Sequence, residues 1–267
     1  MSGETRRRRR KWIVWLLVAV VLGLLVKFIL HLVLPRNFAG TGEKLPLAIS
    51  GPPFETLYYC GPGKPRGIVI LGTGDGGWSY WEENTAKHLA ERGFAVGGWD
   101  CRKFADTRSY DLPALAAGFK AAVEVVRKRS HAGSSAPVWY GGWSTGAEQS
   151  LAAASVSDRP AQLKGLLLAA PGTHGRYGIT EQDLLGVDPS GPGSFALTDI
   201  AKDIKGLRVV QFAAGLDPMD DTDWIKNLSV PYKVIELPGK LHDMGEAGPE
   251  FQQKLDEAIE WTLQSSP

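Results

Sequence analysis

From Ile68 onward, apolar runs of strand length alternate with segments of helical composition at intervals of about thirty residues. The expected strands are residues 68–71, 94–99, 137–141, 165–170, 207–214 and 232–237, and the expected helices include 80–92, 111–129 and 249–264. Such alternation is typical of right-handed β-α-β units around a mostly parallel sheet. Two shorter runs, 45–49 and 54–59, precede it and are separated by a Gly-Pro-Pro turn, which favours an antiparallel pair. We therefore expect an α/β fold.

The strand at 137–141 leads into a G-x-S-x-G box formed by Gly142, Ser144 and Gly146, and a helix rich in small residues follows. This context is the one in which such a box forms a nucleophile elbow, where the serine is held at a strained backbone angle and the glycines leave room for it. Ser144 is the candidate nucleophile. The alternative is a plain glycine turn, which a chain with 32 glycines can contain by chance.

A serine nucleophile needs a base and a group that orients the base, and after this elbow they follow in the order Ser, Asp or Glu, His. Asp217 and His242 each come just after the end of an expected strand. Since ligands of open α/β sheets bind beyond the carboxyl ends of the strands, both residues are expected at the same edge as Ser144. We predict a triad of Ser144, His242 and Asp217, with Asp220 as the alternative acid.

The tetrahedral intermediate of such a reaction also needs two hydrogen-bond donors. One is expected from the backbone N–H of Thr145, the residue after the nucleophile, and the other from the glycine-rich loop at 72–78. We assign the second donor to the N–H of Asp75, with Gly74 as the alternative. A phosphate-binding loop is the competing interpretation, but the Lys-Ser/Thr pair that would complete it is missing. This chemistry requires no metal and no cofactor.

Residues 172–197 form a long irregular segment rich in Gly, Pro, Ser and Asp, and loops of this length are usually functional or disordered. We expect a short lid over the site.

The chain has two cysteines, Cys60 and Cys101. In the expected topology they lie at opposite ends of neighbouring strands, farther apart than the roughly 7 Å between α-carbons that a disulfide allows. Two free thiols are expected.

The first 42 residues differ from the rest in charge. Eight of the 30 Lys and Arg residues lie there with only one of the 29 Asp and Glu residues, so the remainder of the chain is acidic. Residues 1–11 are a basic tip, and residues 12–34 are apolar except for Lys27 and His31. As a helix, residues 12–34 would be about 35 Å long, enough to span a hydrocarbon core of about 30 Å.

Arginines before this span predict a cytoplasmic N-terminus and place the rest of the chain on the far side of the membrane. A cleaved signal peptide is the alternative, but the nearest cleavage site, at residues 37–39, is poor. We expect an uncleaved anchor, a linker at 35–44 and a folded domain over 45–267. Beside an apolar span, membrane topology and anionic lipid explain the arginines better than nucleic-acid binding does.

Four stretches carry a family resemblance: Gly74-Asp75-Gly76-Gly77-Trp78, residues 89–96, Gly142-Trp143-Ser144-Thr145-Gly146, and Leu237-Pro238-Gly239 before His242. On these residues the chain resembles the α/β-hydrolase superfamily, and within it the bacterial virulence protein VirJ/AcvB group. The resemblance covers about residues 66–264. It implies an α/β-hydrolase fold and a periplasmic or membrane-attached serine hydrolase. Some members act on lysyl-phosphatidylglycerol, and others have been linked to secretion systems.

Together these observations predict a single-pass protein of the bacterial inner membrane whose periplasmic domain cleaves a carboxylic ester. An aminoacyl ester of phosphatidylglycerol fits, because aspartates at 217, 220, 221 and 223 place negative charge near the site, although a solvated acidic loop is an equal interpretation of them. The expected partners are a membrane lipid or a small ester, and no nucleic acid. A broader lipase or peptidase, or a non-catalytic scaffold acting as an envelope or secretion adaptor, are the alternatives.

Overall fold

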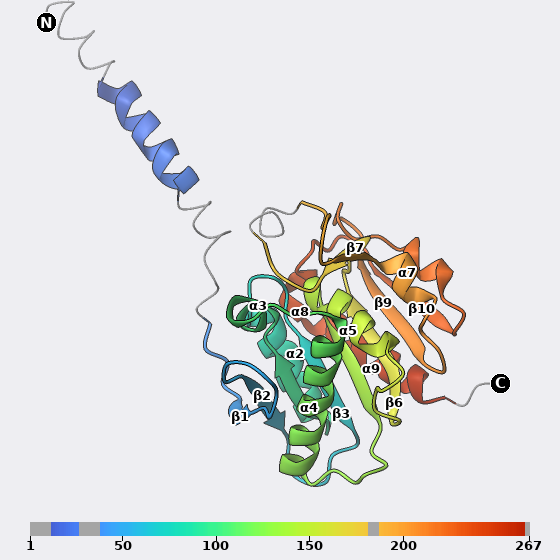
Figure 1. Ribbon diagram of the computed structural model, residues 1–267. Coiled ribbons are helices and arrows are strands. Elements are labelled where there is room, and N and C mark those ends of the chain that lie inside the picture. The colour runs from blue at the N-terminus through green and yellow to red at the C-terminus, as the bar shows by residue number, and fades with distance from the viewer. Residues whose placement is uncertain (1–11, 27–37, 181–186, 265–267) are drawn as a thin grey trace, which may run out of the picture. The chain divides into compact units, whose positions relative to one another are not determined.

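The computed structural model describes residues 12–26, 38–180 and 187–264 (Figure 1). The chain forms two compact units, Met1–Pro35 and Arg36–Pro267. In the first unit, residues 12–26 form a helix with exposed side chains. The remainder of the predicted anchor, residues 27–34, and the basic tip lie outside the described residues. Within the described ranges, no helix is both long enough and apolar enough to cross a membrane.

The second unit is built on a sheet whose eight described strands follow the order β1-β2-β4-β3-β5-β6-β9-β10. These strands are β1 (Glu43–Pro46), β2 (Glu55–Cys60), β3 (Ile68–Gly72), β4 (Ala95–Trp99), β5 (Val138–Trp143), β6 (Leu163–Ala169), β9 (Arg208–Ala214) and β10 (Tyr232–Leu237). β2 pairs antiparallel with both β1 and β4, and every pairing from β4 to β10 is parallel. The predicted mostly parallel sheet and the antiparallel pair before it are confirmed.

Helices cover both faces of this sheet (Figure 1). The core of one face includes side chains of α4 (Leu112–Ser130), α5 (Thr145–Ser155), α7 (Leu197–Ala201) and the 3-10 helix η1 (Trp224–Asn227). The core of the other face includes side chains of α2 (Tyr80–Glu91), α8 (Met244–Ala247) and α9 (Pro249–Leu263). Because both faces are covered, the central strands read as uninterrupted apolar runs.

Strand β3 shows this arrangement directly. All five of its residues are buried, with Ile68 and Ile70 in one core and Val69 and Leu71 in the other. Side chains alternate between the two faces of a strand, so one short apolar run contributes to both cores. The carboxyl end of β3 thereby becomes a fixed point from which the following loop starts.

A short helix that the sequence interpretation lacked, α3 (Cys101–Thr107), follows β4. It is capped by Asp100, whose carboxylate accepts a hydrogen bond from the Lys103 N–H at 2.9 Å. Cys60 pairs with Ala95 at the start of β4, whereas Cys101 follows the end of that strand. Both cysteines are free thiols, as predicted.

Candidate active site

Ser144 lies at the turn between β5 and α5 with φ 52° and ψ −125°, a conformation that L residues rarely adopt. Its N–H donates to the Ala169 carbonyl at 2.9 Å. A Cβ on Gly146 would lie 2.3 Å from the Gly72 carbonyl carbon, and one on Gly142 would lie 2.5 Å from the Gly72 oxygen. The turn therefore has the strained backbone predicted for an elbow, and its glycines are required by direct backbone contact with β3.

His242 and Asp217 lie beside each other, beyond the ends of β10 and β9. His242 Nδ1 is 2.5 Å from Asp217 Oδ2, and the Asp217 side chain is only 2% exposed. Burial raises the pKa of Asp217, but the hydrogen bonds from His242 and from the Met219 N–H outweigh it, so the net pKa is lowered. The carboxylate is therefore ionised at neutral pH and accepts a hydrogen bond from the Nδ1–H group of His242, which leaves Nε2 as the basic nitrogen.

Asp220, the alternative acid, has a different set of partners. Its Oδ2 accepts the Ala214 N–H at 2.7 Å and its Oδ1 accepts from Gln211 Nε2 at 2.8 Å. Burial raises its pKa to about 6. Asp220 ties the turn back to the end of β9, while Asp217 is the residue that contacts His242.

The nucleophile and the base are connected through Trp143, the residue before Ser144. The centroids of the Trp143 and His242 rings are 5.1 Å apart, and Trp143 Nε1 donates to the His242 carbonyl at 2.8 Å. On its other side Trp143 stacks with Trp81 of α2 at 5.9 Å. One indole thus holds the elbow, the His242 loop and α2 together.

The loop after β3 lies against the elbow from the opposite side. A Cβ on Gly74 would lie 3.1 Å from the Trp143 ring. The Gly77 N–H donates to the Gly74 carbonyl at 3.1 Å, which places Asp75 at the second position of a tight turn. The Gly74 N–H, the alternative oxyanion donor, donates to Glu82 Oε1 at 3.2 Å. Thr145 begins α5, so its N–H is one of the first amides of the helix, which have no acceptor within the helix itself.

A family model described as serine aminopeptidase, S33, matches residues 63–186, which contain the elbow and the loop after β3. No match is found among curated protein sequences. Solved structures resemble this chain over most of its length at low sequence identity. A thermostable carboxyl esterase from Bacillus coagulans has a TM-score of 0.64 and 15% identity, covering 83% of this chain and 99% of that chain.

Two further solved structures are similar to this chain in overall fold. A serine hydrolase without a lid from Xanthomonas campestris has a TM-score of 0.55 and 17% identity over 86% of this chain and 99% of that one. Dienelactone hydrolase from Anabaena variabilis has a TM-score of 0.59 and 17% identity over 82% and 95%. The chain has the α/β-hydrolase fold. The narrower resemblance to the VirJ/AcvB group stays a prediction.

Within this domain, the sequence interpretation missed the contacts of Trp143 with His242 and of Glu82 with the loop after β3. Trp143 occupies a variable position of the box, and nothing in the motif shows that its ring contacts His242. Glu82 was recognisable in part, because Ser79 and Glu82 have the spacing of a capping box, which forms at the start of α2. Among the described residues, no group of three or more His, Cys, Asp or Glu side chains could hold a metal ion.

The segment predicted as a lid, residues 172–197, contains a small antiparallel pair, β7 (His174–Arg176) and β8 (Ser194–Ala196). Arg176 is buried, and its Nη2 donates to the Ser190 carbonyl at 2.7 Å. Gln149 of α5 donates to the Arg176 carbonyl at 3.1 Å, which fastens this pair to the helix behind the elbow. Residues 181–186 lie outside the described residues, and the lid role stays a prediction.

Proposed function

We propose that this α/β-hydrolase is a serine hydrolase that cleaves carboxylic esters, with Ser144 as nucleophile, His242 as base and Asp217 as the orienting acid. The observation that carries the proposal is the 2.5 Å contact between His242 and a buried Asp217, held against an elbow whose serine has a φ of 52°. Structural ion pairs also bring histidine and aspartate together. The pair of His242 and Asp217 differs from a structural ion pair because Trp143, the residue next to the strained Ser144, contacts the loop that carries His242.

In the proposed reaction, Ser144 Oγ attacks the ester carbonyl carbon while its proton passes to His242 Nε2. The N–H groups of Thr145 and Asp75 stabilise the oxyanion. His242 then gives the proton to the leaving alkoxide, which departs as an alcohol and leaves an acyl-enzyme. Water, deprotonated by His242, attacks this ester, and collapse of the second tetrahedral intermediate releases the carboxylic acid and restores Ser144.

The substrate that we propose is an aminoacyl ester of a phospholipid headgroup, such as lysyl-phosphatidylglycerol. Exposed apolar side chains flank the acid and the base: Leu216 is 60% exposed, Met219 46% and Leu241 60%. The Leu216 N–H donates to the Lys240 carbonyl at 2.9 Å, so the two loops that carry these side chains run together. An apolar rim beside a site favours a lipidic substrate, and the acidic turn favours a cationic acyl group.

The proposed location follows from the N-terminal sequence. Residues 12–34 would anchor the protein in the bacterial inner membrane with residues 1–11 in the cytoplasm and the hydrolase domain in the periplasm. A reporter that is active only outside the cytoplasm, fused after residue 267, is expected to be active, and cytoplasmic activity alone would contradict this topology. Membership of the VirJ/AcvB group is proposed on the four stretches of the folded domain that carry the resemblance, residues 74–78, 89–96, 142–146 and 237–239.

Peptide hydrolysis is the second candidate, and the match to the serine aminopeptidase model favours it. Aminoacyl p-nitrophenyl esters and aminoacyl p-nitroanilides share the acyl group and differ in the bond that is cut. We expect turnover of the esters, whereas faster cleavage of the anilides would indicate a peptidase.

The first test is labelling with a fluorophosphonate, which reacts with an activated serine. Wild-type protein is expected to label and to hydrolyse p-nitrophenyl esters, and Ser144→Ala is expected to lose both while remaining folded. If wild-type protein neither labels nor hydrolyses any ester, and Ser144→Ala causes no phenotype, the domain is a non-catalytic scaffold. Unchanged aminoacyl-lipid levels in a deletion strain would contradict the lipid substrate alone.

A further inference from the structure

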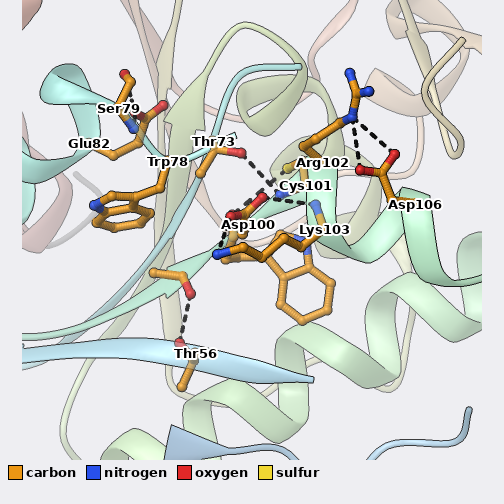
Figure 2. Close-up of polar contacts among 12 residues, drawn as sticks. Thr56, Thr73, Trp78, Ser79, Glu82, Asp100, Cys101, Arg102, Lys103 and Asp106 are labelled. Carbon is orange, nitrogen blue, oxygen red and sulfur yellow. Dashed lines mark hydrogen bonds and ion pairs between the residues drawn. The ribbon is translucent and has the colours of Figure 1, made fainter. Parts of the chain in front are cut away.

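The loop between β3 and α2 is fixed at two places by buried polar groups. At its start, Thr73 Oγ1 accepts the Cys101 N–H at 3.0 Å, and the Thr73 N–H donates to the Trp99 carbonyl at 3.0 Å. Figure 2 shows the contact of Thr73 with Cys101 on one side of the loop and the contact of Glu82 with Ser79 on the other. Thr73 thus joins the start of the loop to the end of β4.

The second of these groups is Glu82, in the first turn of α2. Its side chain is completely buried. Oε1 accepts the Gly74 N–H at 3.2 Å, and Oε2 accepts the Ser79 N–H at 2.8 Å and the Ser79 hydroxyl at 2.5 Å. One carboxylate therefore bridges the two ends of the segment 74–79, and in its ionised form it can accept all three bonds.

We propose that Glu82 is a positioning residue for the oxyanion hole: its carboxylate fixes the turn at residues 74–77 so that the N–H of Asp75 faces the elbow at Ser144. This inference rests on the proposed function, because it needs the serine reaction to have a consequence for catalysis. It assigns Glu82 a role that capping of α2 alone does not require, since a capping box needs the Ser79 N–H and not the Gly74 N–H.

The cost of burying this group supports a role beyond capping. Burial raises the pKa of Glu82 to about 7, although the hydrogen bonds from Ser79 and Gly74 lower it. A capping glutamate on an exposed helix end avoids this desolvation. A buried carboxylate gives fixed, charge-assisted bonds in return, and the donors of an oxyanion hole must be fixed before the reaction begins.

The matched variants are Glu82→Gln and Glu83→Gln, two isosteric changes at neighbouring buried carboxylates. In Glu82→Gln the amide nitrogen must face one of the N–H donors, so the bridge loses at least one bond. Glu83 contacts other groups: the Tyr59 hydroxyl at 2.6 Å, Trp78 Nε1 at 3.0 Å and the Thr41 hydroxyl at 2.5 Å. It accepts from no residue of the turn at 74–77 in these bonds, so Glu83→Gln tests the effect of a buried carboxylate as such.

For p-nitrophenyl ester hydrolysis, we expect Glu82→Gln to lower kcat about tenfold to a hundredfold with KM little changed, because oxyanion donors act on the transition state. Glu83→Gln is expected to keep kcat. An unchanged kcat in Glu82→Gln, or an equal loss in Glu83→Gln, would overturn the inference.

Amide hydrogen exchange gives a readout that does not depend on turnover. Exchange of the amides at residues 74–79 is expected to accelerate at least tenfold in Glu82→Gln and to stay at the wild-type rate in Glu83→Gln. Unchanged exchange in Glu82→Gln would overturn the positioning role even if no ester were hydrolysed. Inactive wild-type protein would contradict the proposed function, and exchange would still decide whether Glu82 fixes the turn.

Discussion

Two regions flank Ser144, and they differ in the groups that the proposed reaction would use: side chains in one and backbone N–H groups in the other. On the acid–base side of the proposed site, the side chains of Asp217 and His242 would act, and they lie on loops beyond β9 and β10 with exposed neighbours such as Leu241. On the proposed oxyanion side, backbone N–H groups would act, and the loop after β3 is supported by the fully buried Glu82, whose carboxylate accepts hydrogen bonds from the Gly74 and Ser79 N–H groups. Side-chain chemistry tolerates a partly exposed loop, whereas backbone donors depend on the groups that hold the backbone still.

The acid–base side is expected to give the largest effect. Asp217→Asn should lower kcat about 10⁴-fold, because an asparagine favours the wrong tautomer of His242. Asp220→Asn should cost about tenfold or less, since Asp220 contacts the end of β9 and not His242. Steady-state kinetics on an activated ester measures kcat of both variants, and losses in the reverse order would make Asp220 the acid.

On the oxyanion side, the buried Glu82 is expected to make the stability of the domain depend on pH. Glu82 has a pKa of about 7 in the folded protein against its ordinary 4.5, so the folded state binds the proton more tightly. Its contribution is therefore full below about pH 4.5 and is lost as the pH rises through 7, a change on the order of 3 kcal/mol. The difference in urea unfolding free energy between wild type and Glu82→Gln should fall across this window. Parallel profiles would contradict the assignment.

The junction of the two regions is the contact of Gly146 with Gly72. Gly146→Ala should destabilise the domain by about 1 to 3 kcal/mol, because a Cβ would lie 2.3 Å from backbone atoms of β3. Gly178→Ala is the control, since a Cβ there would meet no atom within 4 Å. Equal unfolding midpoints for the two variants would show that the elbow yields to the added methyl group.

The smallest effect is expected in α8, a short turn after His242 whose backbone is left-handed. Residues 244–247 all have positive φ, and Glu246 among them is exposed with φ 48°. Glu246→Gly should raise stability by about 0.5 kcal/mol, because glycine accepts this conformation at a lower cost than other residues do. Glu91→Gly, at an exposed position in the last turn of α2, should instead destabilise. Thermal unfolding of the pair distinguishes relief of strain from a general effect of glycine.

The same contrast explains what the sequence could predict. Strand ends and residue types were enough to predict that Asp217 and His242 lie close together. Asp217 follows the fully buried β9, and His242 follows β10, which was recognisable as a strand although it contains Lys233 and Glu236 and is mostly exposed. The short α3 and the pair β7–β8 were missed, since neither has enough residues for a periodic pattern. The Glu82 bridge was missed for a different reason: its acceptors are matched to backbone N–H groups, and backbone groups have no signature in the sequence.

The two free cysteines differ in a way that makes them natural probes of this architecture. Cys101 is completely buried at the end of β4, and burial raises the pKa of its thiol well above the ordinary value, whereas Cys60 is partly exposed beside the start of that strand. An alkylating reagent should therefore modify Cys60 in the native protein and reach Cys101 only when the centre of the sheet opens. With no engineered cysteine, one chain therefore carries a thiol that reacts in the folded state and a second thiol whose reaction reports on opening of the core.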